Sequence, residues 1–186
     1  TINVSGTWGG SVNRPDTYVF QTFVHEIGHA LGLGHAGNYN GGAIYGQDEL
    51  FANDSWQASV MSYFHQSENT SIDASFAYVV TPMLADILAI QSLYGVAATR
   101  SGDTVYGLGG NSGTYLDTWT DLSAPTALTL LDSGGRDVID LSHSAFAQRL
   151  DLRAEAVSDV LGLTGNLVIA RDTVIEEART GAGSDT

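Results

Sequence analysis

A segment of eleven residues that begins at His25 constrains this chain more than any other part of it, and it reads His-Glu-Ile-Gly-His-Ala-Leu-Gly-Leu-Gly-His. On a helix, His25 and His29 project from one face because they are four residues apart, and Glu26 stands beside the first of them. Gly32 can adopt a positive φ, end the helix and turn the chain back. His35 would then approach the helical pair from a second direction. The segment therefore predicts a metal site with three histidines.

The pattern H-E-x-x-H-x-x-G-x-x-H is the metzincin form of the zinc-protease motif. A bare histidine pair can arise by chance on a helix surface, but five fixed positions argue against chance here. A second motif, Ser59-Val-Met-Ser-Tyr63, has the form of the Met-turn that follows the zinc helix in metzincins. Met61 would then lie beneath the metal, and Tyr63 could turn its phenol toward it. Ordinary core packing is the alternative for both residues.

Composition limits the class of protein and its partners. With 186 residues, 43 % of them hydrophobic and 15 % charged, the chain is expected to fold into one sizeable domain or two small ones. A net charge of −14 and the absence of Lys argue against nucleic acid and membranes as partners. The many Gly and Asp residues suit calcium, although a solvated acidic surface would have the same composition. No Cys is present, so disulfides and thiolate ligands are excluded.

Local patterns predict two helices in the first half of the chain. The first should run over 17–31, with Asp16 as its N-cap, and it carries the histidines. The second should begin at Thr81-Pro82 and end at Gly95. Residues 1–4 resemble the end of a strand, and a loop rich in Gly and Ser follows them. Neither a transmembrane run nor a signal peptide is expected in this sequence.

The sequence pattern changes after about residue 100, where short apolar runs alternate with Gly, Asp and Ser turns. We therefore expect an α+β fold with two domains, 1–97 and 98–186. One turn of a calcium-binding nonapeptide, G-G-x-G-x-D-x, is suggested by the last seven residues, but a single copy is weak support. The candidate strands are 105–106, 128–131, 138–141, 149–152, 167–169 and 173–175.

The chain resembles the serralysins, bacterial secreted metzincin proteases that carry a repeat-in-toxin calcium module. The resemblance implies a metzincin lower subdomain with the zinc-site helix and a second helix. An all-β calcium-binding sandwich, the start of a β-roll, would follow. The segments that carry the resemblance are 18–42, 59–64, 82–95, 102–107, 132–137 and 158–166.

Roles for individual residues follow from this resemblance. His25, His29 and His35 would bind zinc, and Glu26 would be the general base that activates water. Tyr63 matches a tyrosine that ligates zinc in the resting enzyme and stabilises the oxyanion. The resemblance also implies calcium ligands, the first three mainly through backbone oxygens: Arg100, Gly102, Thr104, Asp132, Gly134, Gly135, Asp137, Val174 and Glu176. The spacing D-x-G-G-x-D suits one ion between two carboxylates, whereas a plain glycine turn is the alternative.

The sequence departs from the serralysin pattern at three positions outside the zinc motif. Ala36 stands where proline is usual, Asn38 where aspartate is common, and Thr180 replaces the first glycine of the nonapeptide. The catalytic domain of the family also begins well before the zinc helix, so we expect this chain to be a fragment of a longer protein. His65 and His143 are interpreted as surface or turn residues.

The expected function is that of a secreted, extracellular zinc endopeptidase from a bacterium, with zinc and calcium as cofactors. Its partners would be protein or peptide substrates, and in addition a proteinaceous inhibitor or the missing N-terminal part of the protease. The alternative is a catalytically inactive fragment that acts as a calcium-binding structural module. Zinc content and casein cleavage distinguish the two.

Overall fold

Helix α1 spans Tyr18–Ala30 in a computed structural model that describes residues 14–186. The strand predicted at 1–4 and most of the loop after it lie outside the described residues. Thr17 caps the helix, since its Oγ1 accepts the N–H of Phe20 at 3.2 Å. The prediction that Asp16 is the cap is wrong, because its buried carboxylate accepts the N–H groups of Ser123 and Ala124 instead. This bond pair ties the start of α1 to the C-terminal half.

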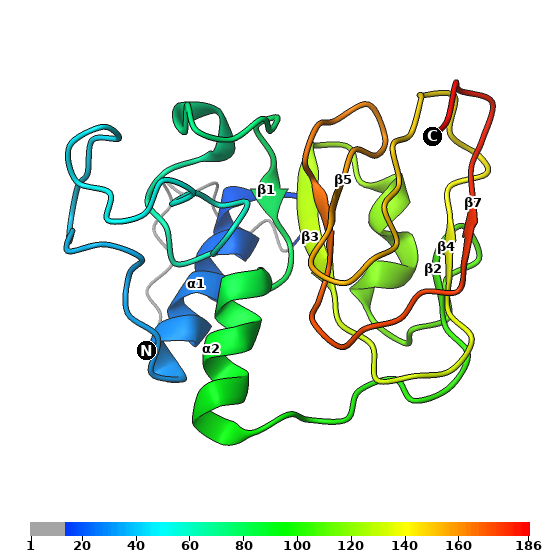
Figure 1. Cartoon of the computed structure of the whole chain (residues 1–186), viewed down its shortest axis with the longest axis horizontal. Coiled ribbons are helices and arrows are strands. Elements are labelled where there is room, and N and C mark those ends of the chain that lie inside the picture. The colour runs from blue at the N-terminus through cyan, green and yellow to red at the C-terminus, as the bar shows by residue number, and fades with distance from the viewer. Residues whose placement is uncertain (1–13) are drawn as a thin grey trace.

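Helix α2 spans Leu84–Tyr94 and begins later than the predicted Thr81-Pro82 start. The hydroxyl of Thr81 is used elsewhere, because it accepts the N–H of Thr129 at 2.8 Å. Gly95 ends the helix with a φ of +86°, as predicted. In Figure 1, α1 and α2 lie together on one side of the molecule, and most of the strands lie on the other.

The strands form two small sheets. In the first, whose order is β1-β3-β6-β5, all pairs are parallel except β5 with β6. The second has the order β2-β4-β7 and is parallel throughout. The strand bounds are Tyr78–Val79 (β1), Val105–Gly107 (β2), Thr126–Leu130 (β3), Val138–Asp140 (β4), Val157–Ser158 (β5), Leu167–Ile169 (β6) and Glu177–Arg179 (β7). Two 3-10 helices, η2 at Gln66–Glu68 and η3 at Tyr115–Asp121, complete the fold.

Two predicted strands are absent from the described structure. The run 149–152 makes only an isolated bridge between Arg149 and Asp159, and the N–H of Asp151 bonds the hydroxyl of Ser158. The run 173–175 is not a strand either, because Thr173 bonds the backbone of Asp132 through its side chain. Three strands were not predicted: β1 and β5, each of two residues, and β7 at the C-terminal end.

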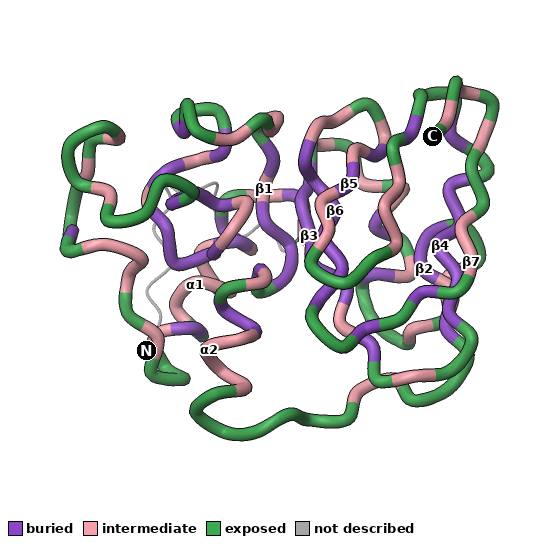
Figure 2. Tube along the Cα trace, viewed as in Figure 1, coloured by how far each residue is buried: buried purple, intermediate pink, exposed green. Residues whose placement is uncertain are grey.

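Two hydrophobic clusters join the halves of the chain. One packs Val80 against residues of the C-terminal strands such as Leu128 and Ile139. In the other cluster, Val168 of the C-terminal half packs with Met61 and Val79 of the N-terminal half. Figure 2 shows buried segments running through both the helical part and the β part. Because β1 pairs with β3 across the predicted boundary at 97/98, the two halves share a sheet, and the division into domains stays a prediction.

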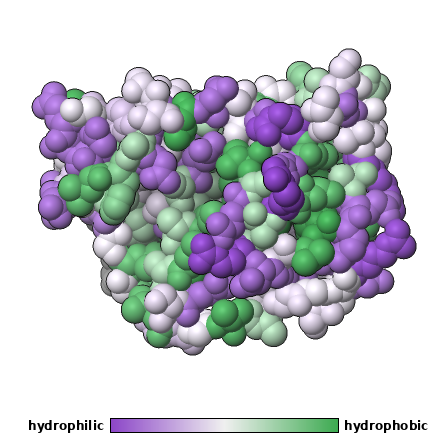
Figure 3. All heavy atoms as spheres, in the orientation of Figure 1, coloured by the Kyte–Doolittle hydropathy of each residue, from purple (hydrophilic) through white to green (hydrophobic). Residues whose placement is uncertain are grey.

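Hydrophilic residues spread over the face of the molecule seen in Figure 3, with hydrophobic residues between them. Within residues 14–186, no helix has both the length and the apolar character that crossing a bilayer requires. The α+β class expected from the sequence is confirmed by the helices and small sheets of the structure.

Candidate metal centre

Three histidines converge at the end of α1. His25 and His29 lie one turn apart on the helix, and Gly32 then takes a φ of +95°. The returning chain is fixed by the N–H of Leu33, which donates to the carbonyl of Gly28 at 3.0 Å. His35 thereby faces the helical pair, with its Nε2 at 3.1 Å from the Nε2 of His29. One ring nitrogen from each of the three lies within 4.8 Å of the others.

Each imidazole is oriented by a backbone carbonyl at its Nδ1. His25 bonds the carbonyl of Val60 at 2.8 Å, His29 that of Leu33 at 2.9 Å, and His35 that of Tyr39 at 2.8 Å. A carbonyl oxygen only accepts, so each neutral ring must carry its proton on Nδ1. The lone pairs are then left on the three Nε2 atoms. This is the tautomer that can bind a metal through Nε2.

The spacing of His29 and His35 fits two ligands of one zinc ion. Two Nε2 lone pairs that face each other at 3.1 Å repel unless a cation or a proton lies between them. Two nitrogens bound tetrahedrally to one zinc at about 2.0–2.1 Å stand about 3.3 Å apart. Burial lowers the pKa of His25, which favours its neutral, ligating form. In the part of the chain that the structure describes, this is the only such group of three His, Asp or Glu side chains.

Met61 packs against Gly28 of α1, the residue that directly precedes His29. Its side chain is buried, and its Sδ would stand 2.5 Å from a Cβ added at Gly28. Real Cβ atoms do not approach a sulfur this closely, so Gly28 leaves the room that Met61 occupies. Position 28 of the zinc motif is therefore restricted by packing against a segment more than thirty positions away.

We expect Gly28→Ala to destabilise the chain by about 1–2 kcal/mol. Overpacking a core typically costs about 1–3 kcal/mol, and the better helix propensity of Ala returns up to about 1 kcal/mol. Urea denaturation measures the difference. Gly34→Ala is the matched control, because no heavy atom of the described residues lies within 4 Å of a Cβ at that position. A Gly28→Ala variant more stable than the parent would contradict the packing argument.

Glu26 and Tyr63 both border the cleft that opens beside His25. The cleft has a volume of about 480 Å³ and also includes Gly41 and Trp56 in its walls. Glu26 is half-buried, and the ring of Tyr63 packs 4.5 Å from the ring of His35. The phenolic oxygen of Tyr63 accepts the N–H of Gly41 at 3.4 Å. The structure thus brings both predicted catalytic residues to the rim of the histidine cluster.

A second group of predicted ligands gathers in the β part. Asp137 is fully buried, and its Oδ1 accepts the N–H of Thr104 at 2.8 Å, whereas its Oδ2 has no hydrogen-bond partner among residues 14–186. Burial raises the pKa of Asp137, and the nearby charges of Asp132 and Glu176 raise it further. The carboxylate of Glu176 accepts the N–H of Asp137 at 2.7 Å. An orphaned buried carboxylate oxygen close to two further acids is a fitting environment for a cation.

The remaining predicted calcium ligands surround these acids to different degrees. Gly135 has a φ of +132°, and a Cβ there would stand 2.6 Å from the carbonyl oxygen of Gly102. Gly134 donates its N–H to Asp132 at 3.0 Å. Arg100 has a φ of +48° and directs its guanidinium to the hydroxyl of Tyr106. The Val174 side chain is 63 % exposed and contributes no ligand atom, so only its backbone could take part.

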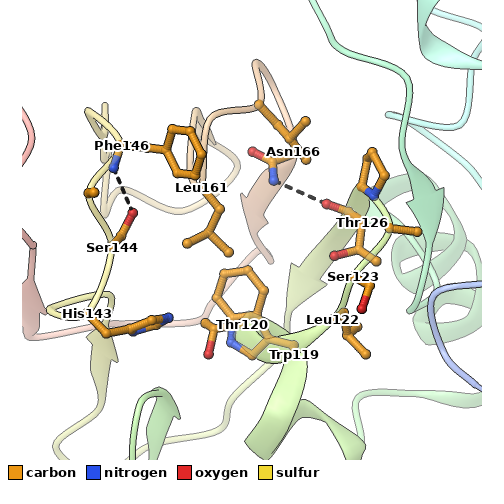
Figure 4. A pocket seen from close by; sticks show the side chains of 14 residues that line it. Trp119, Thr120, Leu122, Ser123, Thr126, His143, Ser144, Phe146, Leu161 and Asn166 are labelled. Carbon is orange, nitrogen blue, oxygen red and sulfur yellow. Dashed lines mark hydrogen bonds between the residues drawn. The ribbon is translucent and has the colours of Figure 1, made fainter.

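Another cleft, of about 410 Å³, lies in the β part and includes none of the predicted metal ligands. Figure 4 shows His143 and Phe146 on one side of it, Trp119 below and Asn166 on the other side. Asn166 donates to the carbonyl of Thr126 at 3.1 Å. His143 is therefore separate from the histidine cluster. His65 is also separate, because it lies near Glu68 in a turn, at 3.4 Å.

Comparisons with known proteins agree with this geometry. Residues 96–186 match the family described as Peptidase M10 serralysin C terminal, and residues 3–77 match Peptidase M66. Serralysin C of Dickeya chrysanthemi is 45 % identical over 174 residues, which cover 91 % of this chain and 36 % of that protein. Serralysin of Photorhabdus luminescens is 39 % identical, with coverage of 97 % and 40 %. Metalloprotease AprA of Pseudomonas entomophila is 41 % identical, with coverage of 90 % and 36 %.

The histidine cluster and these relatives together show that the chain comes from a family of metalloproteases. More narrowly, the chain belongs to the serralysin family, as the sequence resemblance predicted. It spans a little over a third of the length of the curated relatives that it matches. The name of the Pseudomonas relative, a metalloprotease, indicates that the family in general uses a metal.

Sequence reasoning missed the groups that orient the ligands. The acceptors for the three Nδ1 atoms are backbone carbonyls of Val60, Leu33 and Tyr39, and a backbone group carries no residue-type signal. Tyr39 is itself held by its hydroxyl, which donates to both oxygens of Asp54 at 3.1 Å. Only the aromatic and acidic character of that pair could have been noticed in the sequence.

Proposed function

We propose that this chain is the metal-binding part of a secreted bacterial zinc endopeptidase that cleaves proteins or peptides. The observation that carries the proposal is the set of three imidazoles whose Nδ1 protons are all committed to carbonyls. His25, His29 and His35 would hold the zinc. When bound, zinc supplies a Lewis acid that polarises the substrate carbonyl and makes water more acidic.

The residues around the histidines have separate tasks in hydrolysis. Glu26, on the rim of the cleft beside His25, takes a proton from the attacking water and passes it to the leaving nitrogen. Tyr63 lines the same cleft and donates its hydroxyl proton toward the carbonyl oxygen as that oxygen gains charge. Met61 takes no part in proton transfer and supports the histidines by packing.

The proposal extends to the rest of the chain. Residues 1–97 would be the C-terminal part of a metzincin catalytic domain, and residues 98–186 the start of a calcium-binding β-roll domain. Calcium would be held by Asp132, Asp137 and Glu176 with backbone oxygens nearby. Family membership supports export to the extracellular medium, and the acidic surface supports protein substrates over nucleic acid or membranes. A proteinaceous inhibitor and the remaining part of the protease are further proposed partners.

A second candidate function is that of a calcium-binding structural module without catalysis. The orphaned Oδ2 of Asp137 favours it independently of the histidines. Zinc analysis and casein cleavage by the 186-residue chain separate the two candidates. One zinc per chain with cleavage supports the endopeptidase, and zinc without cleavage supports an inactive part of a protease. Calcium binding without zinc supports the structural module alone.

We expect zinc to be lost as the pH falls below about 6, because protons then compete for the imidazoles. Zinc affinity falls as the pH falls, because only the neutral form of each ring has a lone pair on Nε2. Burial lowers the pKa of His25, so this ligand stays neutral further into the acid range than a free histidine. Metal analysis after equilibration between pH 8 and pH 5 tests this. A zinc affinity that does not change with pH would contradict the imidazole ligand set.

A further inference from the structure

Asp86 lies in the first turn of α2, and its buried carboxylate accepts three hydrogen bonds. Its Oδ1 accepts the hydroxyl of Ser59 at 2.6 Å. Its Oδ2 accepts the N–H of Val60 and the N–H of Met83, both at 2.8 Å. The side chain is almost inaccessible to solvent, at 2 % exposure. A carboxylate that receives three donors is held in one orientation, and it holds those donors in turn.

Val60 connects Asp86 to the histidine cluster. The N–H of Val60 donates to Asp86, and the carbonyl of the same residue accepts the Nδ1 proton of His25 at 2.8 Å. Val60 is itself buried, so both bonds are shielded from bulk solvent. The orientation of one residue therefore links a carboxylate on α2 to a ring on α1.

The turn around Val60 is attached to α2 at a further point. The N–H of Ala85 donates to the carbonyl of Ala58 at 3.0 Å. The N–H of Met61 donates to the hydroxyl of Ser59 at 3.0 Å, and Ser59 donates onward to Asp86. Asp86 thus lies where the bonds of residues 59 and 60 meet, and no other side chain bonds both of them in the described structure.

We propose that Asp86 is a positioning residue for His25: it fixes the Val60 carbonyl on Nδ1 and thereby presents Nε2 of His25 to a metal. The proposal deepens the proposed zinc site and rests on it for the identity of the metal. The orientation of His25 itself does not depend on that identity. Asp86 touches neither substrate nor metal, so it acts only through Val60.

Substituting Asn for Asp86 would weaken this arrangement with little change in volume. An Asn side chain offers one uncharged acceptor oxygen. Turned toward Val60 and Met83, that oxygen replaces their charge-assisted bonds with weaker neutral ones, while the NH₂ group donates to the Ser59 hydroxyl. In the other amide orientation, the NH₂ group faces both N–H donors, and the bonds to Val60 and Met83 are lost. Asp86→Glu keeps the charge but moves the carboxylate by one methylene, and it is the second variant if Asp86→Asn does not fold.

The first readout uses the metal-free 186-residue chain with ¹⁵N-labelled histidine. In the parent chain, the Nδ1 protons of the three cluster histidines should each give a protected NMR signal. In Asp86→Asn or Asp86→Glu, we expect faster solvent exchange and a shifted signal for His25 alone. The signals of His29 and His35 are internal controls, because their carbonyl partners, Leu33 and Tyr39, do not contact Asp86.

The second readout is the zinc dissociation constant, measured by competition with a chelator. Loss of a group that orients a metal ligand typically weakens binding about 10- to 100-fold, and we expect this for both Asp86 variants. Ser59→Ala is the comparison variant: it removes the bond to Oδ1 and the bond that the hydroxyl accepts from the Met61 N–H, but it leaves Val60 bonded to Oδ2. We expect its His25 signal to stay close to that of the parent.

An unchanged His25 signal in a folded Asp86 variant would overturn the proposal. So would equal changes at all three histidines, since these would mean that Asp86 only stabilises the fold. If Asp86→Asn does not fold, Asp86→Glu decides by the same criteria. If the parent chain binds no zinc, the proposed function fails, while the His25 signal still decides the role of Asp86.

Discussion

Glu26→Gln is expected to leave the zinc content unchanged and to reduce peptide hydrolysis about 10²- to 10⁴-fold, the usual contribution of a general base. Gln matches the shape of Glu but cannot take a proton at neutral pH. Glu26 lines the cleft next to His25, and it is not one of the three side chains whose ligand atoms cluster. Its role is therefore separable from metal binding.

The measurement needs whichever form of the protein cleaves casein, the 186-residue chain or a longer one. Zinc stoichiometry and kcat are compared for the parent and for Glu26→Gln. Glu155→Gln is the matched control, because Glu155 is exposed and pairs with Arg171 in the β part. Substantial hydrolysis by the zinc-loaded Glu26→Gln variant would rule out this residue as the base. Zinc loss in that variant would instead make Glu26 part of the ligand set.

The sequence predicted the helices and the histidine cluster because these depend on local spacing. His25 and His29 share a helix face by periodicity, and Gly32 takes the positive φ that its lack of a Cβ allows. Helix ends were less predictable. Thr17 and Asp16 are both good caps, and only the distant Ser123 decided which of them was free to cap α1.

The strands were harder to predict than the helices. A strand of two residues, such as β1 or β5, has no periodicity to detect. The run 173–175 has the composition of a strand, but the hydroxyl of Thr173 bonds the backbone of Asp132 in place of a regular ladder. Likewise, the role of Asp86 depends on a contact between α2 and Val60, 26 positions apart, which local patterns do not encode.

Calcium is expected to raise the melting temperature of this chain, and Asp137→Asn is expected to abolish most of that rise. At 100 times the dissociation constant, a ligand stabilises the folded state by about 2.7 kcal/mol, which for a chain of this length is roughly 5–10 °C. Without a cation, Asp137 lies buried beside Asp132 and Glu176, and its raised pKa shows that the ionised form is disfavoured there.

Asp137 makes the folding stability of the calcium-free chain depend on pH. Because the pKa of Asp137 is raised in the folded state, this group contributes stability below its unfolded pKa of about 3.8. That contribution is lost as the pH rises through the folded value. Bound calcium favours the ionised carboxylate and opposes this loss, so the stabilisation by calcium should grow with pH over the same window.

Asp121→Asn is the matched control for Asp137→Asn. Both changes remove one negative charge from a chain with a net charge of −14, but Asp121 is exposed on η3, whereas Asp137 is buried. Calorimetry with calcium, magnesium or a chelator measures the shift. Magnesium should stabilise less, since it prefers octahedral geometry and retains its waters. An equal calcium shift in Asp137→Asn and Asp121→Asn would mean that calcium acts by screening the overall charge and that Asp137 is no ligand.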